Sequence, residues 1–97
     1  MKLQKMKVNS NKLYSIGYSS KLDKFILCCV VPGSVWYDRF YEITEEKFNM
    51  FDTNTGELDK LVDNIRKSNY ESDKFLCSEM VNENSKEQLE LLCLLNE

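Results

Sequence analysis

The side chains that could do chemistry in this 97-residue chain are carboxylates and thiols, because the sequence contains no histidine. Without histidine there is no imidazole base, no Ser-His or Cys-His pair and no mixed Cys/His zinc site. Three glycines leave no glycine-rich loop to hold a phosphate, and neither a P-loop nor a C-x-x-C motif occurs. These residue types predict a protein that is not an enzyme and that uses no cofactor or metal.

Carboxylates are the remaining candidates for general acid–base catalysis. Asp38 and Glu42 share the even-numbered face of one expected strand. Four residues of strand separate them by about 13 Å, which is too far for the carboxyl pair of a typical glycosidase. Solvation of the surface explains the two residues more simply. A small enzyme that uses carboxylate or thiol chemistry stays an alternative.

The cysteines are placed as buried hydrophobic side chains would be. Cys28 and Cys29 are adjacent in an apolar run, and adjacent side chains of a strand point to opposite faces, so the two cannot easily bind one ion. Free cysteine in apolar surroundings behaves as a small hydrophobic residue. Reduced thiols are typical of a cytoplasmic protein. We therefore expect reduced core thiols at Cys28, Cys29, Cys77 and Cys93.

Length and composition predict a single globular domain over residues 1–97. The apolar fraction is 42% and the charged fraction 30%, as in ordinary folded proteins. No apolar run approaches the roughly 18 to 20 residues that cross a bilayer, and no apolar region follows the charged residues 1–7 as it would in a signal peptide. We expect a cytoplasmic protein that does not contact a membrane.

The net charge of −3 hides an asymmetry along the chain. Residues 1–25 carry six lysines against one aspartate, a balance of +5, so residues 26–97 carry seven basic and fifteen acidic side chains, a balance of −8. An acidic body repels nucleic acid and favours basic partners, although these charges could serve only solubility. Residues 1–11 are polar and lysine-rich, and we predict that they form a flexible N-terminal arm.

Four segments have the patterns of β-strands. Tyr14, Ile16 and Tyr18 alternate with small residues, which predicts a strand with one buried face. Phe25–Val31 is continuously apolar, as in a strand that is covered on both faces. The turn Pro32–Ser34 separates this run from a third strand, so the first three strands should form an antiparallel meander. The expected strands cover residues 12–18, 25–31 and 35–43, and residues 75–80 can add a fourth.

Two helices are expected between the third and fourth strands. Thr44 can cap the first, and Phe48 and Phe51 give it one apolar edge. The second runs to about Lys67 and has the clearest helical stripe in the chain. The predicted fold class is α+β: a small antiparallel sheet covered by two or three helices, with the helices on one face. The stripe consists of Leu58, Leu61, Val62 and Ile65.

A last helix is expected over about Lys86 to Leu95. Ser85 and Gln88 form a capping box at its start. Apolar residues lie on nearly all sides of this helix, so its apolar surface is wider than the single stripe of a helix that packs on one core. The helix could lie centrally in the core, or it could leave a leucine edge that a second copy buries in a homodimer.

Aromatic and acidic side chains give the candidate partner-binding site. Trp36 and Tyr37 lie beside acidic residues in the third strand, and aromatic side chains next to charges are typical of interface hot spots. Asp59 and Asp63, four residues apart on a helix, would form one exposed acidic ridge. The aromatic side chains could instead fill the core, and the ridge could be only a solvated face. The eight candidates are Trp36, Tyr37, Asp38, Glu42, Glu45, Glu46, Asp59 and Asp63.

The sequence pattern of residues 13–80 resembles that of small bacterial immunity proteins. These proteins accompany the toxins of contact-dependent growth inhibition and other polymorphic toxin systems. The resemblance implies a cytoplasmic protein that binds a toxin nuclease domain tightly, often over its active site. Nuclease toxins are generally basic, which agrees with the acidic body of this chain. The segments that carry the likeness are Ser15–Ser19, Val30–Pro32, Val35–Tyr37 and Tyr41–Ile43.

The expected function is therefore neutralisation of a cognate toxin by occlusion of its active site or substrate surface. The candidate carboxylates would stand in for substrate phosphates while Trp36 or Tyr37 anchors the contact. One alternative is a regulatory or scaffold module, either monomeric or homodimeric, that binds another protein through its last helix. Another is a nucleic-acid binder that uses the lysine-rich arm.

Overall fold

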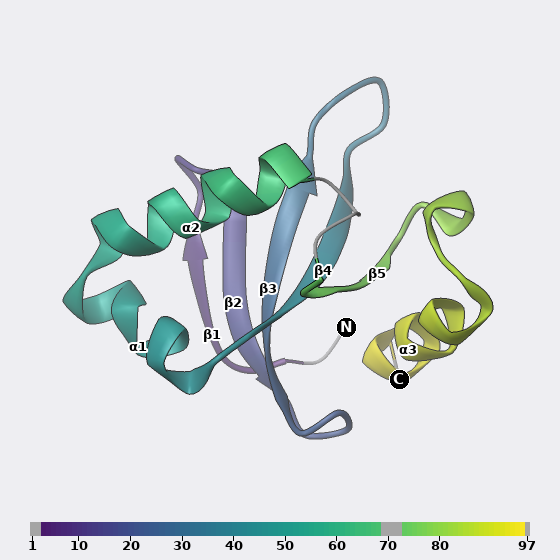
Figure 1. Ribbon diagram of the computed structural model, residues 1–97, viewed down its shortest axis with the longest axis horizontal. Coiled ribbons are helices and arrows are strands. Elements are labelled where there is room, and N and C mark those ends of the chain that lie inside the picture. The colour runs from purple at the N-terminus through teal and green to yellow at the C-terminus, as the bar shows by residue number, and fades with distance from the viewer. Residues whose placement is uncertain (1–2, 69–72, 97) are drawn as a thin grey trace.

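The computed structural model describes residues 3–68 and 73–96 as an α+β fold, the class that the sequence predicted. Figure 1 shows the arrangement of its elements. In chain order these are β1 (Gln4–Asn9), β2 (Tyr14–Ser19), β3 (Lys24–Val31), β4 (Tyr37–Ile43), α1 (Glu45–Thr53), α2 (Thr55–Ser68), β5 (Phe75–Ser78), the 3-10 turn η2 (Val81–Glu83) and α3 (Lys86–Asn96).

The strands form one antiparallel sheet in the order β1-β2-β3-β4-β5. Successive hairpins join the first four strands, whereas α1 and α2 lie between β4 and β5 in the chain. Tyr14 pairs with Cys29 across β2 and β3, and Cys28 pairs with Phe40 across β3 and β4. This register places β3 at the centre of the sheet, where an apolar sequence can be buried on both faces.

Strand β1, Gln4–Asn9, lies within the segment of residues 1–11 for which the sequence predicted a flexible arm, of which residues 1–2 lie outside the described residues. Most side chains of β1 are exposed, so the strand is held by backbone pairing with β2 and by a close approach to Gly17. A Cβ atom at Gly17 would lie 2.8 Å from Cβ of Leu3 and 3.2 Å from the carbonyl oxygen of Gln4. Glycine at this position therefore lets the N-terminal segment pack directly on β2.

Helices α1 and α2 cover one face of the sheet, which we call the closed face. The apolar stripe of α2 is confirmed, because Leu58, Val62 and Ile65 are buried against the strands. Thr44 caps α1 as predicted, and its side chain accepts a hydrogen bond from the backbone N–H of Lys47 at 3.2 Å. The buried cluster on this face consists of Tyr14, Ile16, Leu27, Cys29, Tyr41, Ile43, Phe48, Leu58, Val62, Ile65 and Phe75.

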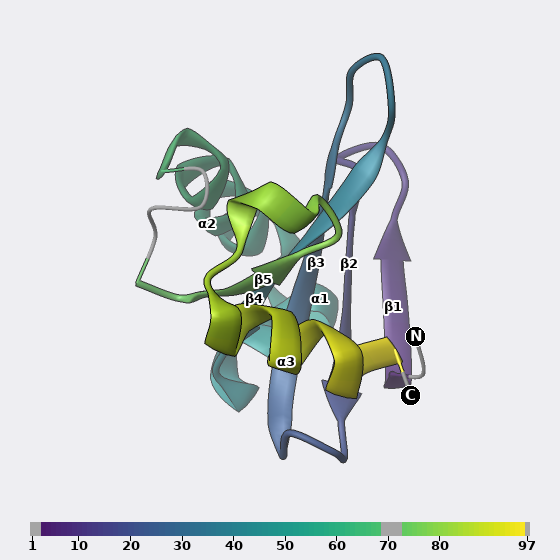
Figure 2. The ribbon, with the colours of Figure 1, turned by 90° about the vertical axis from the view of Figure 1, so that its right-hand side faces the viewer.

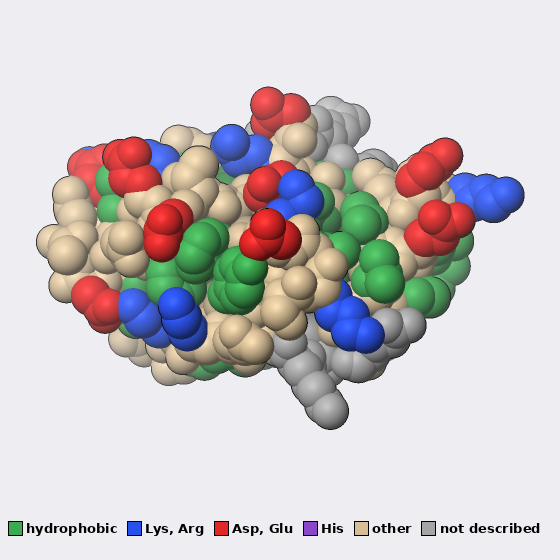
Figure 3. Space-filling model, turned by 90° about the horizontal axis from the view of Figure 1, so that it is seen from below, with side chains coloured by type: hydrophobic (Ala, Val, Ile, Leu, Met, Phe, Trp, Pro, Cys, Tyr) green, Lys and Arg blue, Asp and Glu red, His purple; other side chains and the backbone are tan. Residues whose placement is uncertain are grey.

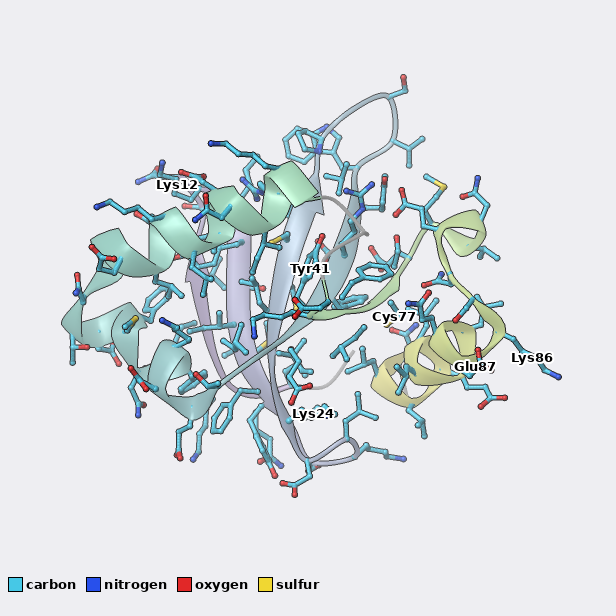
Figure 4. The ribbon with its side chains drawn as sticks, viewed as in Figure 1. Lys12, Lys24, Tyr41, Cys77, Lys86 and Glu87 are labelled. Carbon is cyan, nitrogen blue, oxygen red and sulfur yellow. The ribbon has the colours of Figure 1, made fainter. Side chains whose placement is uncertain are left out.

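Helix α3 lies on the opposite face, which corrects the prediction that the helices share one face (Figure 2). The alternation of β3 explains this, since Leu27 and Cys29 point to the closed face while Ile26 and Cys28 point to the other and also require cover. Figure 4 labels Tyr41 on β4 and Cys77 on β5, the strand next to α3. The second buried cluster consists of Ile26, Cys28, Phe40, Cys77 and Leu95, with Leu3, Leu22, Leu76, Leu91 and Leu92 packed against it.

The wide apolar surface of α3 is divided between core and solvent. Its capping box is confirmed, since Gln88 N donates to Ser85 Oγ and Ser85 N donates to Gln88 Oε1. Leu94 is 38% exposed. Cys93 is also exposed, which corrects the prediction of a core position for this thiol, whereas the other three thiols are buried. Among the residues that the structure describes, no helix has the length and apolar character needed to cross a membrane.

Candidate partner-binding surface

The hairpin between β3 and β4 presents the largest exposed aromatic side chain of the described chain. Strand β4 begins at Tyr37, two residues later than predicted, so Val35 and Trp36 belong to the loop. Trp36 is 62% exposed, and all five loop residues from Pro32 to Trp36 are exposed. The prediction that Trp36 could fill the core is therefore wrong, and its indole is available to a partner.

A partly buried ion pair fixes the base of this hairpin to the turn that follows β5. The Arg39 guanidinium donates two hydrogen bonds to the Glu83 carboxylate, at 2.9 and 2.7 Å, in a bidentate pair. The Tyr37 hydroxyl donates to the same carboxylate at 2.8 Å. The Arg39 and Glu83 side chains are only 11% and 12% exposed. This bridge joins residues 44 positions apart and places η2 beside the start of β4.

The bridge has a clear electrostatic signature. Hydrogen bonds from Arg39 lower the pKa of the Glu83 carboxyl from its ordinary 4.5 to about 2, with a further contribution from the Tyr37 hydroxyl. The same hydrogen bonds raise the pKa of the Arg39 guanidinium. Burial, followed by the hydrogen bond to Glu83, raises the pKa of Tyr37. All three groups therefore keep their ordinary charge at neutral pH, and the hairpin base is held by a charged pair.

Asn84 holds the turn that carries Glu83 in place. Its side-chain amide donates to the carbonyl oxygen of Ser78 at 2.8 Å, and its Oδ1 accepts from the backbone N–H of Ser78 at 2.7 Å. The amide also donates to the carbonyl oxygen of Met80 at 3.2 Å. These bonds replace strand pairing where β5 ends, so the turn has a defined conformation.

Asp38 meets Glu79 on the opposite face of β4. The backbone N–H of Asp38 donates to Glu79 Oε1 at 2.7 Å, and the backbone N–H of Glu79 donates to the carbonyl oxygen of Asp38 at 3.0 Å. Burial, and then the nearby charge of Glu79, raise the pKa of the Asp38 carboxyl. Two carboxylates thus lie side by side next to the hairpin.

These contacts join two short segments that each carry exposed apolar side chains. Val35 and Trp36 precede the bridge residue Tyr37, while Met80 and Val81 precede Glu83. Large apolar residues exposed together are typical of a protein-binding surface. We use the name hairpin surface for Val35, Trp36, Asp38, Glu79, Met80 and Val81.

The acidic candidates at the far end of β4 lie apart from the hairpin surface. Glu42 is exposed and pairs with Lys24 at 3.0 Å, and about 13 Å of strand separates it from Asp38. Glu45 and Glu46 are exposed in the first turn of α1. Figure 3, which views this end of the molecule, shows acidic and basic side chains interspersed with apolar ones. The local charge here is therefore mixed.

The two aspartates of α2 have different environments, so the predicted exposed ridge is wrong for one of them. Asp59 is half-buried and accepts hydrogen bonds from the Tyr14 hydroxyl at 2.9 Å and from Asn9 Nδ2 at 3.3 Å. Burial, together with Asp59, raises the pKa of Tyr14 to about 12. Asp63 is exposed. Asp59 therefore ties β1 and β2 to α2, and Asp63 remains on the surface.

Of the eight candidates, Tyr37 and Asp38 contact residues that the sequence analysis missed, and Trp36 directly precedes them in the chain. Glu79 and Glu83 come from the turn between β5 and α3, where no local pattern marks them. The only signal was the acidic and apolar composition of a short segment, Glu79–Glu83, after a strand.

The side chains that the sequence analysis considered for catalysis and metal binding have defined environments in the structure. No group of three or more His, Cys, Asp or Glu side chains among them could hold a metal ion. Burial raises the pKa of Cys28 and of Cys77 to about 12 and that of Cys29 to about 11, so these thiols are poor nucleophiles. No protein-family model, curated protein or solved structure matches this chain.

Proposed function

We propose that this protein works by binding a basic protein partner, and specifically that it is a cytoplasmic immunity protein that neutralises a bacterial toxin. The observation that carries the proposal is the indole of Trp36, 62% exposed on a hairpin whose base is fixed by the Arg39–Glu83 bridge. The toxin assignment follows from the resemblance of residues 13–80 to small immunity proteins.

A fixed hairpin favours tight binding. Ordering a loop on binding opposes association, and a loop that is already ordered avoids that loss. Tryptophan is also among the residues that contribute most to protein interfaces. Because Tyr37 bonds to Glu83, the strand that follows Trp36 is held before any partner arrives. Trp36 can therefore act as a preformed anchor.

Charge supplies the second argument. Residues 26–97 carry an excess of eight acidic side chains, and Asp38 and Glu79 place two of them beside the anchor. A nuclease domain must attract phosphate with basic side chains, so an acidic surface next to an apolar anchor would fit over such a site. The proposed mechanism is occlusion of the toxin's active site or substrate surface.

The test is rescue of growth in bacteria. The C-terminal domain encoded by a large toxin gene adjacent to the gene of this protein would be expressed alone and with this protein. We expect growth arrest alone, rescue by the wild type and loss of rescue by Trp36→Ala, because removal of a hot-spot aromatic weakens binding by about 2 kcal/mol or more.

Leu94→Ala is the matched control, since it removes an exposed apolar side chain from α3. It should leave rescue intact. Full rescue by Trp36→Ala together with loss of rescue by Leu94→Ala would instead support the alternative of a module that binds through α3. An adjacent domain that does not affect growth would count against the toxin assignment.

The nucleic-acid alternative has less support from the structure. Lys7 of β1 is engaged within the fold: it forms an ion pair with Asp52, and its ammonium lies 4.8 Å from the centre of the Phe48 ring. Part of the positive charge that would bind phosphate is thereby directed towards α1.

A further inference from the structure

Helix α3 covers only part of its face of the sheet and leaves a cavity at the other end. The helix packs near the β2–β3 turn, where its cluster includes Leu22 and Ile26, and Figure 2 shows the strands continuing beyond it. The uncovered end, between the β1–β2 turn and the β3–β4 hairpin, contains an open cavity of about 220 Å³. Its lining includes Val8, Leu13, Ser15, Val30 and Asp38.

The strand register accounts for this lining. Val8 pairs with Ser15, and Val30 pairs with Asp38. Directly paired residues of an antiparallel sheet point to the same face, with side chains about 5 Å apart. The apolar side chains of Val8 and Val30 therefore form the walls, and the Asp38 carboxylate lies at the hairpin end of the cavity.

The carboxylate of Asp38 has no compensating charge within the described parts of the chain. Neither an ion pair nor a hydrogen bond to it is found there. Its carboxylate neighbour is Glu79, which adds negative charge, and partial burial together with that neighbour raises its pKa. A half-buried carboxylate without a cation is unfavourable, so binding of a positive group would relieve both the burial and the repulsion.

We propose that this cavity receives one lysine or arginine side chain of the partner protein, with its aliphatic stem between Val8 and Val30 and its positive group on the Asp38 carboxylate. Lysine and arginine combine an apolar stem with a charged end, which matches apolar walls that lead to a carboxylate. A neutral apolar side chain would bury Asp38 further without a partner, and an acidic one would be repelled. The inference rests on the proposed function, because it specifies how the basic partner is recognised beside Trp36.

The direct test uses small probes and needs no toxin. Isotope-labelled protein would be titrated with N-acetyl-lysine amide, N-acetyl-arginine amide and the neutral N-acetyl-norleucine amide, and backbone amide signals followed by NMR. We expect the two cationic probes to shift the signals of Ser15, Val30 and Asp38 more strongly than the neutral probe does. Asp38→Asn should weaken cationic binding by roughly tenfold or more, since it removes the charged acceptor.

Asp63→Asn is the matched control, because Asp63 is exposed on α2 across the sheet, and it should bind the probes as the wild type does. Asn can retain the backbone hydrogen bonds between residue 38 and Glu79, so Asp38→Asn should fold. The inference is overturned if the norleucine probe binds equally well, if Asp38→Asn binds unchanged, or if the shifts occur elsewhere.

The growth assay separates this inference from the proposed function. If Trp36→Ala abolishes rescue while Asp38→Asn rescues fully, the partner binds without the cavity and the inference fails, although the proposed function stands. If the cationic probes bind at Asp38 but no toxin is neutralised, the cavity stands and the toxin assignment fails.

Discussion

The two faces of the sheet are built differently. On the closed face, α1 and α2 cover a cluster of eleven buried residues that includes four of the five strands. On the other face, α3 contributes a single buried residue, Leu95, to a cluster of five, and one end of the face stays open. Burial of apolar area is the main source of stability, so the closed face should determine the stability of the fold while the open end remains free for recognition.

The difference also separates two kinds of acidic residue. On the closed face, Asp59 is used inside the fold, where it accepts from Tyr14 and Asn9. On the open face, Asp38 has a negative neighbour. A carboxylate that is satisfied internally stabilises the fold, and one that is left beside another negative charge favours an external cation. Residue type alone does not distinguish these roles.

The largest expected effect on the free energy of unfolding comes from a cavity in the core of the closed face. Leu58→Ala removes a fully buried side chain of α2 and should lower the free energy of unfolding by about 3 kcal/mol. Leu91→Ala on α3 removes a side chain that is only half-buried and should lower it by about 1 kcal/mol. Urea unfolding followed by circular dichroism measures both. Equal losses would show that the two faces contribute alike.

The next effect is at the partly buried bridge between Arg39 and Glu83. Glu83→Gln keeps the shape of the side chain but removes the negative charge that accepts two hydrogen bonds from the Arg39 guanidinium, which is 11% exposed. Stability at neutral pH should fall by about 2 kcal/mol. Glu87→Gln is the control, since Glu87 is exposed and points outward from α3 (Figure 4), and it should change stability by less than about 0.5 kcal/mol.

The same bridge predicts a dependence on acid. The pKa of Glu83 is lowered in the folded protein to about 2, so its contribution is full above about pH 4.5 and declines as the pH falls towards 2. Urea unfolding of the wild type at a series of pH values should show this loss, and Glu83→Gln should lose less over the same range. Parallel curves for the two proteins would contradict the assignment.

The smallest effect concerns the hydrogen bond that ties the N-terminal strands to α2. Tyr14→Phe removes the donor to Asp59 and should lower the free energy of unfolding by about 1 kcal/mol. Tyr18→Phe removes a hydroxyl that donates to Asp23 at the exposed β2–β3 turn, and it should have almost no effect. If both substitutions have the same effect, the bond between Tyr14 and Asp59 contributes no more than an exposed one.

Local patterns were sufficient to predict the elements whose residues are buried by regular spacing. The stripe of α2 and the caps at Thr44 and Ser85 were visible because helix geometry repeats over short distances. Strand β1 was missed because its side chains are mostly exposed, and what holds it is backbone pairing and the space left at Gly17. Neither of these produces a hydrophobic pattern.

Contacts between distant parts of the chain were not predictable in the same way. The partner of Arg39 is Glu83, and the partner of Tyr14 is Asp59, 45 residues away. Such pairs depend on how β5 and α2 return to the sheet, which spacing within one element does not determine. For this reason the sequence indicated an acidic and aromatic site but could not divide its acids between the interior and the surface.

The neighbouring cysteines of β3 give the two layers separate chemical reporters. Cys28 is buried in the cluster beneath α3, and Cys29 in the cluster beneath α1 and α2. A thiol reacts only when its own layer opens, so its modification rate measures the free energy of that opening. Two variants could each retain one of these thiols, with the other three cysteines replaced. The rates at which one reagent modifies the two thiols would then report how often each helical layer detaches from the same strand.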